Sequence, residues 1–446
     1  MYQTEMKIPD VLEGCGSIEQ WRKKRKRILA DFAAVEYGER PQFPYEVSWN
    51  ELVRETIGEL EATRLRAEIT VKTELGGVTF PVTVFVPRQG EGGADSGGKV
   101  PAAVLICSQS KSPQPMKMPP QMEGKSVPEM VEMFSGMLKQ FGVVMEQSPL
   151  EMLAGMAGQS PSGAPAAGGK ADGGTFDVSP KAPSAMPGLG TSVPLDLDKD
   201  YDNGHWPVRE MMKRGMALVG FYANDVEKDD ASVYPSGLAK IFGTKKERAG
   251  SEWGILAVWA FAASCVMDYV QSVAEIDGKR VAVAGHSRCG KAALWCGALD
   301  ERFAAVMPNG SGCCGAALLR GKTGENLASI QAFFPHWFAP AFKQYRGREG
   351  ELPFDQHFLL AAVAPRVLQV GSGSEDFWAD PDGEHYATCL ASKVWELYGN
   401  GAFSEERPGE DEMAVSGKVG HHLRKGPHKL DVFDWMCLAT HVTSET

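Results

Sequence analysis

The sequence predicts the α/β class, with a mostly parallel central sheet and helices on both of its faces. Five short, nearly continuous apolar runs recur along the chain, at residues 102–107, 217–222, 280–284, 304–307 and 366–370. Such runs are typical of strands buried on both faces of a parallel sheet. Helical stretches separate most of them, and this alternation implies a sheet covered on both sides.

Elements outside these five runs support the same class. Residues 67–74 and 79–87 alternate apolar and polar residues around two glycines, which predicts an antiparallel hairpin at a sheet edge. The clearest helical periodicity lies at residues 253–270. A further helix is predicted over residues 18–35, and we interpret its basic run at 22–27 as a solvated face.

The length of 446 residues allows about three domains or one large domain with an insertion. We favour a single domain over residues 1–446, interrupted at residues 108–200. Of the 30 residues from 161 to 190, 21 are Pro, Gly, Ser or Ala, too few apolar groups to offset their chain entropy. Residues 127–145 carry a Met-rich apolar stripe at helical spacing. We interpret the insertion as partly mobile and its helix as a lid, an oligomer contact or ordinary core packing.

Composition excludes several functions. Lys and Arg number 46 against 57 Asp and Glu, and the net charge of −11 argues against nucleic-acid partners. No run of about 18 apolar residues is present to span a membrane, and no secretory signal is visible. Nine irregularly spaced cysteines form neither a disulfide framework nor a zinc motif. We therefore expect no metal, no membrane partner and a cytoplasmic location, with secretion as the alternative if a signal was removed.

The strongest motif surrounds Ser287. The apolar run at 280–284 leads into residues 285–290, and a helical stretch follows. This is the layout of a nucleophile elbow, in which the serine sits on a strained turn and the next helix directs N–H groups at an oxyanion. The Gly-x-Ser-x-Gly pattern is incomplete, because Cys289 takes the second glycine's place and Gly290 comes one residue late. Helix capping is the alternative role for this serine.

A serine nucleophile requires a base and a carboxylate that orients the base. In an α/β-hydrolase fold they follow in the order serine, acid, histidine. Asp376 comes shortly after the predicted strand at 366–370, at the edge where α/β enzymes place their sites. We choose it as the acid, with Glu375 and Asp380 as competitors.

For the base we choose His428. It follows a Gly-Pro pair on what we interpret as a loop, which also carries His421 and His422 and precedes a helix predicted at 431–440. The order along the chain favours this assignment over surface or capping duty. The remaining histidines are treated as structural or unassigned.

Six spaced motifs occur in one order in the C-terminal half of the chain. They are Gly-x-Ser287-Arg288-x-Gly-Lys291, residues 311–317, 336–338, 352–357 and 374–380, and a final Gly-x-His428. Together they resemble the bacterial glucuronoyl esterases of carbohydrate esterase family fifteen, over about residues 200–446 and more loosely over 1–107. The resemblance implies an α/β-hydrolase that cleaves esters of (4-O-methyl)glucuronic acid. Its partner would be glucuronoxylan or a uronate-ester oligosaccharide, and no cofactor is required.

The resemblance also assigns roles to residues. Ser287 is the nucleophile, His428 the base, and Arg288 directs its guanidinium at the oxyanion. The sequence departs from the family at Gly310, where many members carry the acid, so that Asp376 remains the candidate. It departs again at His286, where fungal members have a disulfide-bonded cysteine.

Three residues would recognise the sugar. By the same resemblance, Lys291 and Glu325 hydrogen-bond hydroxyl groups and Trp378 lines the pocket. Each has a simpler alternative: a solvated helix residue for Lys291, a charge favoured by a helix N-terminus for Glu325, and a core aromatic for Trp378.

Two rivals to the glucuronoyl esterase hypothesis stay open. One is an acetyl xylan esterase or general carboxylesterase with the same triad. The other is a catalytically silent carbohydrate-binding or scaffolding protein whose Met-rich insertion recruits a partner. The spacing of Ser287, Asp376 and His428 argues against the second, and the sequence does not identify an oligomeric partner.

Overall fold

The computed structural model of the chain describes residues 6–88, 98–111, 194–321 and 323–444. Most of the predicted insertion at 108–200, including the predicted helix at 127–145, lies outside the described residues. Within the described ranges, no helix combines the length and apolarity needed to cross a membrane.

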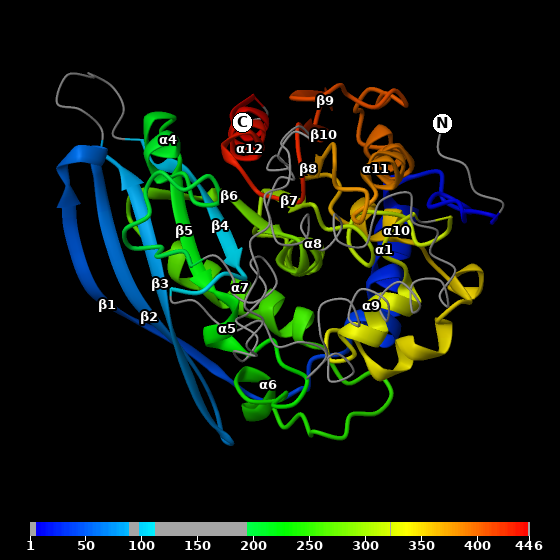
Figure 1. Ribbon diagram of the computed structural model, residues 1–446, viewed down its shortest axis with the longest axis horizontal. Coiled ribbons are helices and arrows are strands. Elements are labelled where there is room, and N and C mark those ends of the chain that lie inside the picture. The colour runs from blue at the N-terminus through cyan, green and yellow to red at the C-terminus, as the bar shows by residue number, and fades with distance from the viewer. Residues whose placement is uncertain (1–5, 89–97, 112–193, 322, 445–446) are drawn as a thin grey trace, which may run out of the picture.

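A ten-stranded sheet forms the centre of the fold, in the order β1-β2-β3-β5-β4-β6-β7-β8-β10-β9 (Figure 1). Its strands are β1 Glu46–Ile57, β2 Ala62–Thr73, β3 Gly76–Pro87, β4 Val100–Cys107, β5 Ala217–Tyr222, β6 Ile276–His286, β7 Ala305–Asn309, β8 Val367–Gly373, β9 Glu412–Ser416 and β10 Val419–Arg424. The strands from β5 to β10 in this order are parallel, whereas β1 to β3 and β9 pair antiparallel. The five predicted apolar runs correspond to β4 through β8.

Helices cover the sheet on both faces. They are α1 Ile18–Phe32, α4 Val208–Lys213, α5 Ala223–Val226, α6 Leu238–Ile241, α7 Ile255–Val270, α8 Arg288–Leu299, α9 Leu327–Phe333, α10 Gln356–Ala361, α11 Pro381–Glu396 and α12 Val432–Ser444, with a π-helical turn at Ala33–Tyr37 and 3-10 turns at Gly58–Leu60, Pro340–Tyr345 and Glu349–Glu351. One apolar cluster joins the sheet to α1, α7, α8, α10 and α11, and a second joins it to α4 and α12.

Strand β4 shows why these strands are continuously apolar. Val104 and Ile106 belong to the cluster beneath α7 and α8, while Ala103 and Leu105 belong to the cluster beneath α4 and α12. Because successive side chains of a strand point to opposite faces, a strand covered on both sides requires apolar residues at every position.

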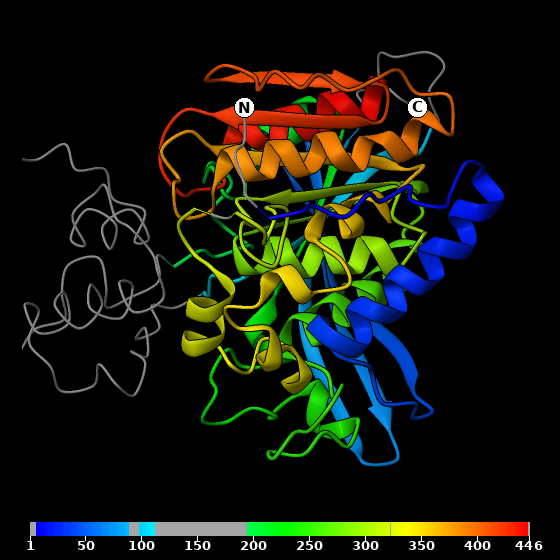
Figure 2. The same ribbon diagram turned by 90° about the vertical axis from the view of Figure 1, so that its right-hand side faces the viewer.

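The predicted basic helix is α1, which lies along the outside of the molecule (Figure 2, blue). Trp21, Ile28 and Phe32 are buried at helical spacing, and Ser17 caps the N-terminus. The interpretation of its basic run as wholly solvated was incomplete. The Arg25 guanidinium donates to the carbonyl oxygens of Ala298 at 2.7 Å and Ala362 at 2.6 Å.

Two predictions were wrong, one about a sheet edge and one about the position of two histidines. The hairpin β2–β3 is present, but β1 lies outside it, so the hairpin is not the edge. The sequence analysis did not identify β1, because most of its residues are exposed and four of its twelve residues are charged. Exposed charges are usual on an edge strand that must resist pairing with other chains. The histidines His421 and His422 lie not on a loop but on strand β10, where both are fully buried.

Burial keeps several histidines neutral in the folded protein. It lowers the pKa of His205 and of His357 to about 4, and it lowers the pKa of His286 and of His421 well below the ordinary value. The unfolded chain binds a proton at each of these sites below pH of about 6.5. Acid therefore favours the unfolded state at these positions.

We predict that the free energy of unfolding falls as the pH drops below about 6.5, by up to ~1.4 kcal/mol per pH unit for each such histidine. Urea unfolding between pH 4.5 and 7.5 measures this slope. The variant His357→Gln keeps a donor for the carbonyl of Pro9, which His357 Nε2 contacts at 3.0 Å, and removes one titrating group. Its slope should be shallower than that of the wild type, and an equal slope would contradict the assignment.

Candidate active site

The predicted nucleophile elbow is formed at the junction of β6 and α8. Ser287 has φ 57° and ψ −124°, a left-handed conformation that is strained for a residue with a side chain. The turn is closed by bonds from Ser287 N to Asn309 O at 2.9 Å and from Gly290 N to Ser287 O at 2.9 Å. The strain presents the half-buried Ser287 side chain at the carboxyl edge of the sheet.

Both glycines of the incomplete motif are closely packed. A Cβ on Gly285 would lie 2.1 Å from the carbonyl oxygen of Cys289, and one on Gly290 would lie 3.0 Å from that of Asn309. Cys289 itself is fully buried, and burial raises the pKa of its thiol. The turn therefore closes with cysteine at the position where the usual pattern has glycine.

The structure brings the chosen acid and base together. Asp376 Oδ2 lies 2.5 Å from His428 Nδ1. Asp376 is buried after β8, and the His428 side chain, on the loop between β10 and α12, is 20% exposed. If Nδ1 carries the proton toward the carboxylate, Nε2 is left as an acceptor, which is the tautomer that a general base requires.

The competing carboxylates have other positions. Asp380 caps α11, where its side chain accepts from Gly383 N at 3.0 Å. Glu375 is exposed. Neither is hydrogen-bonded to His428 among the contacts that the structure describes. Asp376 is therefore the carboxylate that reaches the base.

Arg424 holds the loop that carries His428. Its guanidinium donates to the carbonyl oxygens of Lys425, Pro427 and Lys429 at 2.8, 2.5 and 2.9 Å. In the described part of the chain, Ser287 and His428 are not hydrogen-bonded to each other, although the His428 ring lies 4.4 Å from that of His286, the neighbour of Ser287. Catalytic bonds of this kind commonly shorten only when substrate is bound.

A buried polar series that the sequence analysis did not anticipate lies behind His428. His286 Nδ1 contacts Asn309 Oδ1 at 2.7 Å, and Asn309 Nδ2 donates to Asp434 Oδ1 at 2.8 Å. His422 Nε2 lies 2.8 Å from the same Asp434 oxygen. These residues come from β6, β7, β10 and α12, so no local sequence pattern could have joined them.

The same region explains the glycine at position 310. Gly310 has φ +50°, and a Cβ there would lie 3.1 Å from His286 Cε1 and 3.4 Å from His428 Cε1. A carboxylate side chain at this position would be strained and would meet the His286 ring.

Arg288, the first residue of α8, is one-third exposed and lies over the ring of Trp337, with 4.9 Å between Cζ and the ring centroid. Its Nη1 bonds Asp229 Oδ2 at 2.5 Å. Sequence reasoning missed Asp229, because it lies in an irregular segment 59 residues away along the chain.

The three predicted sugar-binding residues lie on connected segments. Lys291 is buried rather than solvated, and its Nζ donates to Ser311 O at 2.6 Å. Glu325 N donates to Trp378 O at 3.1 Å, which places Glu325 beside a half-buried Trp378. Gly312, next to Ser311, packs against Ala379, next to Trp378.

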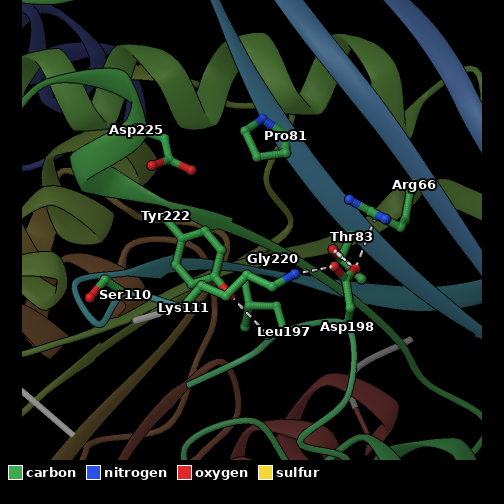
Figure 3. A pocket seen from close by; sticks show the side chains of 10 residues that line it. All are labelled: Arg66, Pro81, Thr83, Ser110, Lys111, Leu197, Asp198, Gly220, Tyr222 and Asp225. Atoms are coloured by element: carbon green, nitrogen blue, oxygen red, sulfur yellow. Dashed lines mark hydrogen bonds and ion pairs between the residues drawn. The ribbon is translucent and has the colours of Figure 1, made fainter. Parts of the chain in front are cut away.

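A pocket of about 350 Å³ lies beside β3 and β5 (Figure 3). Lys111 and Arg66 converge there on Asp198, at 3.0 and 3.3 Å. None of the predicted catalytic or sugar-binding residues lines this pocket. Over the described ranges, no group of three or more His, Cys, Asp or Glu side chains is arranged to hold a metal ion.

Comparisons with known proteins agree on one family. Residues 198–399 match the family described as glucuronyl esterase, fungi. The chain is 40% identical over 243 residues to carbohydrate esterase MZ0003 of an unknown prokaryotic organism, covering 54% of this chain and 56% of that protein. It is 31% identical over 197 residues to the 4-O-methyl-glucuronoyl methylesterase of Podospora anserina, covering 42% of this chain and 40% of that protein. The chain thus spans about half the length of these curated relatives.

Solved structures match along nearly the whole chain. A promiscuous CE15 esterase from the marine bacterial metagenome superposes with a TM-score of 0.73 at 27% identity, covering 100% of this chain and 98% of the other. The chain is thus similar, in sequence over part of its length and in fold over nearly all of it, to glucuronoyl esterases of carbohydrate esterase family 15. A glucuronoyl esterase from Solibacter usitatus superposes with a TM-score of 0.72 at 26% identity, covering 99% of both chains. The α/β-hydrolase fold and the family resemblance predicted from the sequence are confirmed.

We predict that Ser287→Ala abolishes the ester hydrolysis expected of this site while preserving the fold, because the hydroxyl sits on an accessible turn and its removal opens no core cavity. The loss of kcat should approach the ~10⁶-fold scale of a removed triad nucleophile. Labelling of the wild type, but not the variant, by a serine-directed phosphonate provides a second measurement. Retention of more than a few per cent of wild-type turnover would show that the nucleophile is another residue.

We also predict that Asp376→Asn lowers kcat by about three to four orders of magnitude, because the amide favours the wrong His428 tautomer. Glu375→Gln is the matched control, since it removes an adjacent but exposed carboxylate, and it should stay near wild type. If Glu375→Gln or Asp380→Asn loses this activity while Asp376→Asn keeps it, the acid has been misassigned.

Proposed function

We propose that the chain is a serine carboxylic-ester hydrolase that cleaves esters of (4-O-methyl)glucuronic acid. The observation that carries the proposal is the pair of Asp376 and His428, 2.5 Å apart, beside a strained serine turn. Ser287 Oγ attacks the ester carbonyl carbon as His428 Nε2 accepts its proton. His428 then donates that proton to the departing alcohol, leaving the uronate as an acyl ester of Ser287.

The second half of the reaction repeats this geometry with water. His428 removes a proton from a water molecule that attacks the acyl-enzyme, and the proton returns to Ser287 as the uronic acid leaves. In both halves, negative charge develops on the former carbonyl oxygen. The first N–H groups of α8 lack intrahelical partners and Arg288 begins the same helix, so both can stabilise this charge.

Specificity for a uronate acyl group rests on the neighbouring side chains. Lys291 and Glu325 supply polar groups and Trp378 an aromatic surface, a combination suited to sugar rings. The alternative, an acetyl xylan esterase or general carboxylesterase with the same triad, would not use these three residues to recognise its acyl group.

The substrate can be the glucuronoxylan polymer or a soluble oligosaccharide. All nine cysteines are free, which favours a reducing compartment such as the cytoplasm. There the enzyme would meet imported uronate-ester oligosaccharides. In the secreted alternative, it would act on the polymer.

We predict a higher kcat/KM on methyl glucuronate esters than on acetylated xylose, because the acyl side of the substrate is the sugar that the site recognises. Initial rates on the two substrates at matched concentrations measure the preference. Trp378→Ala should lower kcat/KM on the uronate ester more than on a small aryl acetate. A preference for acetylated xylose would instead support the deacetylase alternative.

A further inference from the structure

Asp229 lies beside Arg288, the side chain that the proposed function directs at the oxyanion. It lies three residues after α5, and its side chain is only 10% exposed. Both carboxylate oxygens are engaged. Oδ2 bonds Arg288 Nη1 at 2.5 Å, while Oδ1 accepts from Trp337 Nε1 at 2.7 Å and contacts His336 Nε2 at 2.8 Å.

The carboxylate of Asp229 is ionised. Burial alone raises the pKa of such a group, but Arg288, His336 and Trp337 outweigh burial and hold the pKa of Asp229 well below its ordinary value. His336 Nδ1 is buried and has no hydrogen-bond partner among the described residues, so a proton there would be an unpaired buried donor. His336 therefore meets Asp229 through Nε2, and the Arg288 guanidinium supplies a full positive charge opposite Asp229.

An aromatic surface supports the same guanidinium. Trp337 and Phe334 stack with ring centroids 3.9 Å apart and an interplanar angle of 9°. Arg288 Cζ lies 4.9 Å from the first ring and 5.5 Å from the second. Arginine favours such aromatic faces. Trp337 thus contributes twice, with its ring to Arg288 and with its N–H to Asp229.

We propose that Asp229 is a positioning residue that holds the Arg288 guanidinium in place for the oxyanion. Nη1 is tied to Asp229, and within the described residues no hydrogen bond is made by Nε or Nη2. These donors are left for a ligand oxygen. An arginine side chain loses considerable rotamer freedom when ordered, and donors that are ordered before the reaction stabilise the transition state most effectively.

This inference rests on the proposed function, in which Arg288 donates to the oxyanion. It predicts that Asp229 influences catalysis only through Arg288. A double-mutant cycle tests that dependence directly. The variants are Asp229→Asn, Arg288→Ala and the double mutant, each measured for kcat and KM on a methyl glucuronate ester and for Tm.

We expect Arg288→Ala to lower kcat by ~10²–10³-fold, the effect of removing one oxyanion donor. Asp229→Asn should also lower kcat. On a logarithmic scale, its loss of kcat should be at least roughly one-tenth to one-half of the loss caused by Arg288→Ala. KM should change by less than about threefold, because a positioned donor acts mainly in the transition state. The double mutant should have the kcat of Arg288→Ala within about twofold.

Asp268→Asn is the matched control. Asp268 Oδ1 bonds Arg302 Nη1 at 2.5 Å, a partly exposed ion pair of the same length that has no role in the site. This variant should retain the wild-type kcat. If Asp229→Asn does not fold, Asp229→Glu keeps the charge but displaces it by one methylene, and it should lower kcat without raising KM.

The outcomes separate the two hypotheses. The positioning role of Asp229 is overturned if Asp229→Asn keeps the wild-type kcat. It is also overturned if Asp229→Asn lowers kcat by the same factor whether it is introduced into the wild type or into Arg288→Ala. If Arg288→Ala itself keeps the wild-type kcat, the role of Arg288 in the proposed function fails instead.

Discussion

The turn at Ser287 depends on the close approach of β6 and α8, and the rest of the site is built outward from it. Gly285 permits this approach, since any side chain there would overlap the carbonyl of Cys289. The bond from Ser287 N to Asn309 O fastens the turn to β7. With the turn in place, Arg288 is the first residue of α8, so the candidate nucleophile and the cation are neighbours in the chain. Backbone strain at one residue thus positions two candidate catalytic groups.

Buried carboxylates then hold the surrounding segments. Glu384 on α11 accepts from Gly312 N at 2.8 Å and from Ser372 Oγ at 2.5 Å, joining α11 to the segment after β7 and to the end of β8. Asp434 on α12 joins that helix to β7 and β10 in the same way, through its contacts with Asn309 and His422. A buried carboxylate is stable only when its oxygens are bonded. Each one therefore restricts the backbone that supplies its donors more tightly than apolar packing would.

Around Gly310, the packing of two histidine rings limits which residue can occupy position 310. His286 lies against the catalytic candidate His428, with 4.4 Å between ring centroids, and its Nδ1 is bonded to Asn309. Gly310 leaves room for both rings. The carboxylate that contacts His428 comes from elsewhere, from Asp376 in the segment after β8.

The sequence alone determined the parallel core, the elbow at Ser287 and the family resemblance. The reason is that strands buried on both faces must be apolar at every position and a tight strand–helix turn demands small residues, so both leave local signals. Strands β1 and β10 left no such signal, because β1 is mostly exposed and β10 faces buried polar partners. Only the tertiary structure brought Asp229 to Arg288 and Asp434 to Asn309. Those contacts join residues 59 and 125 positions apart, and a hydrogen bond between distant segments imposes no pattern on the sequence around either partner.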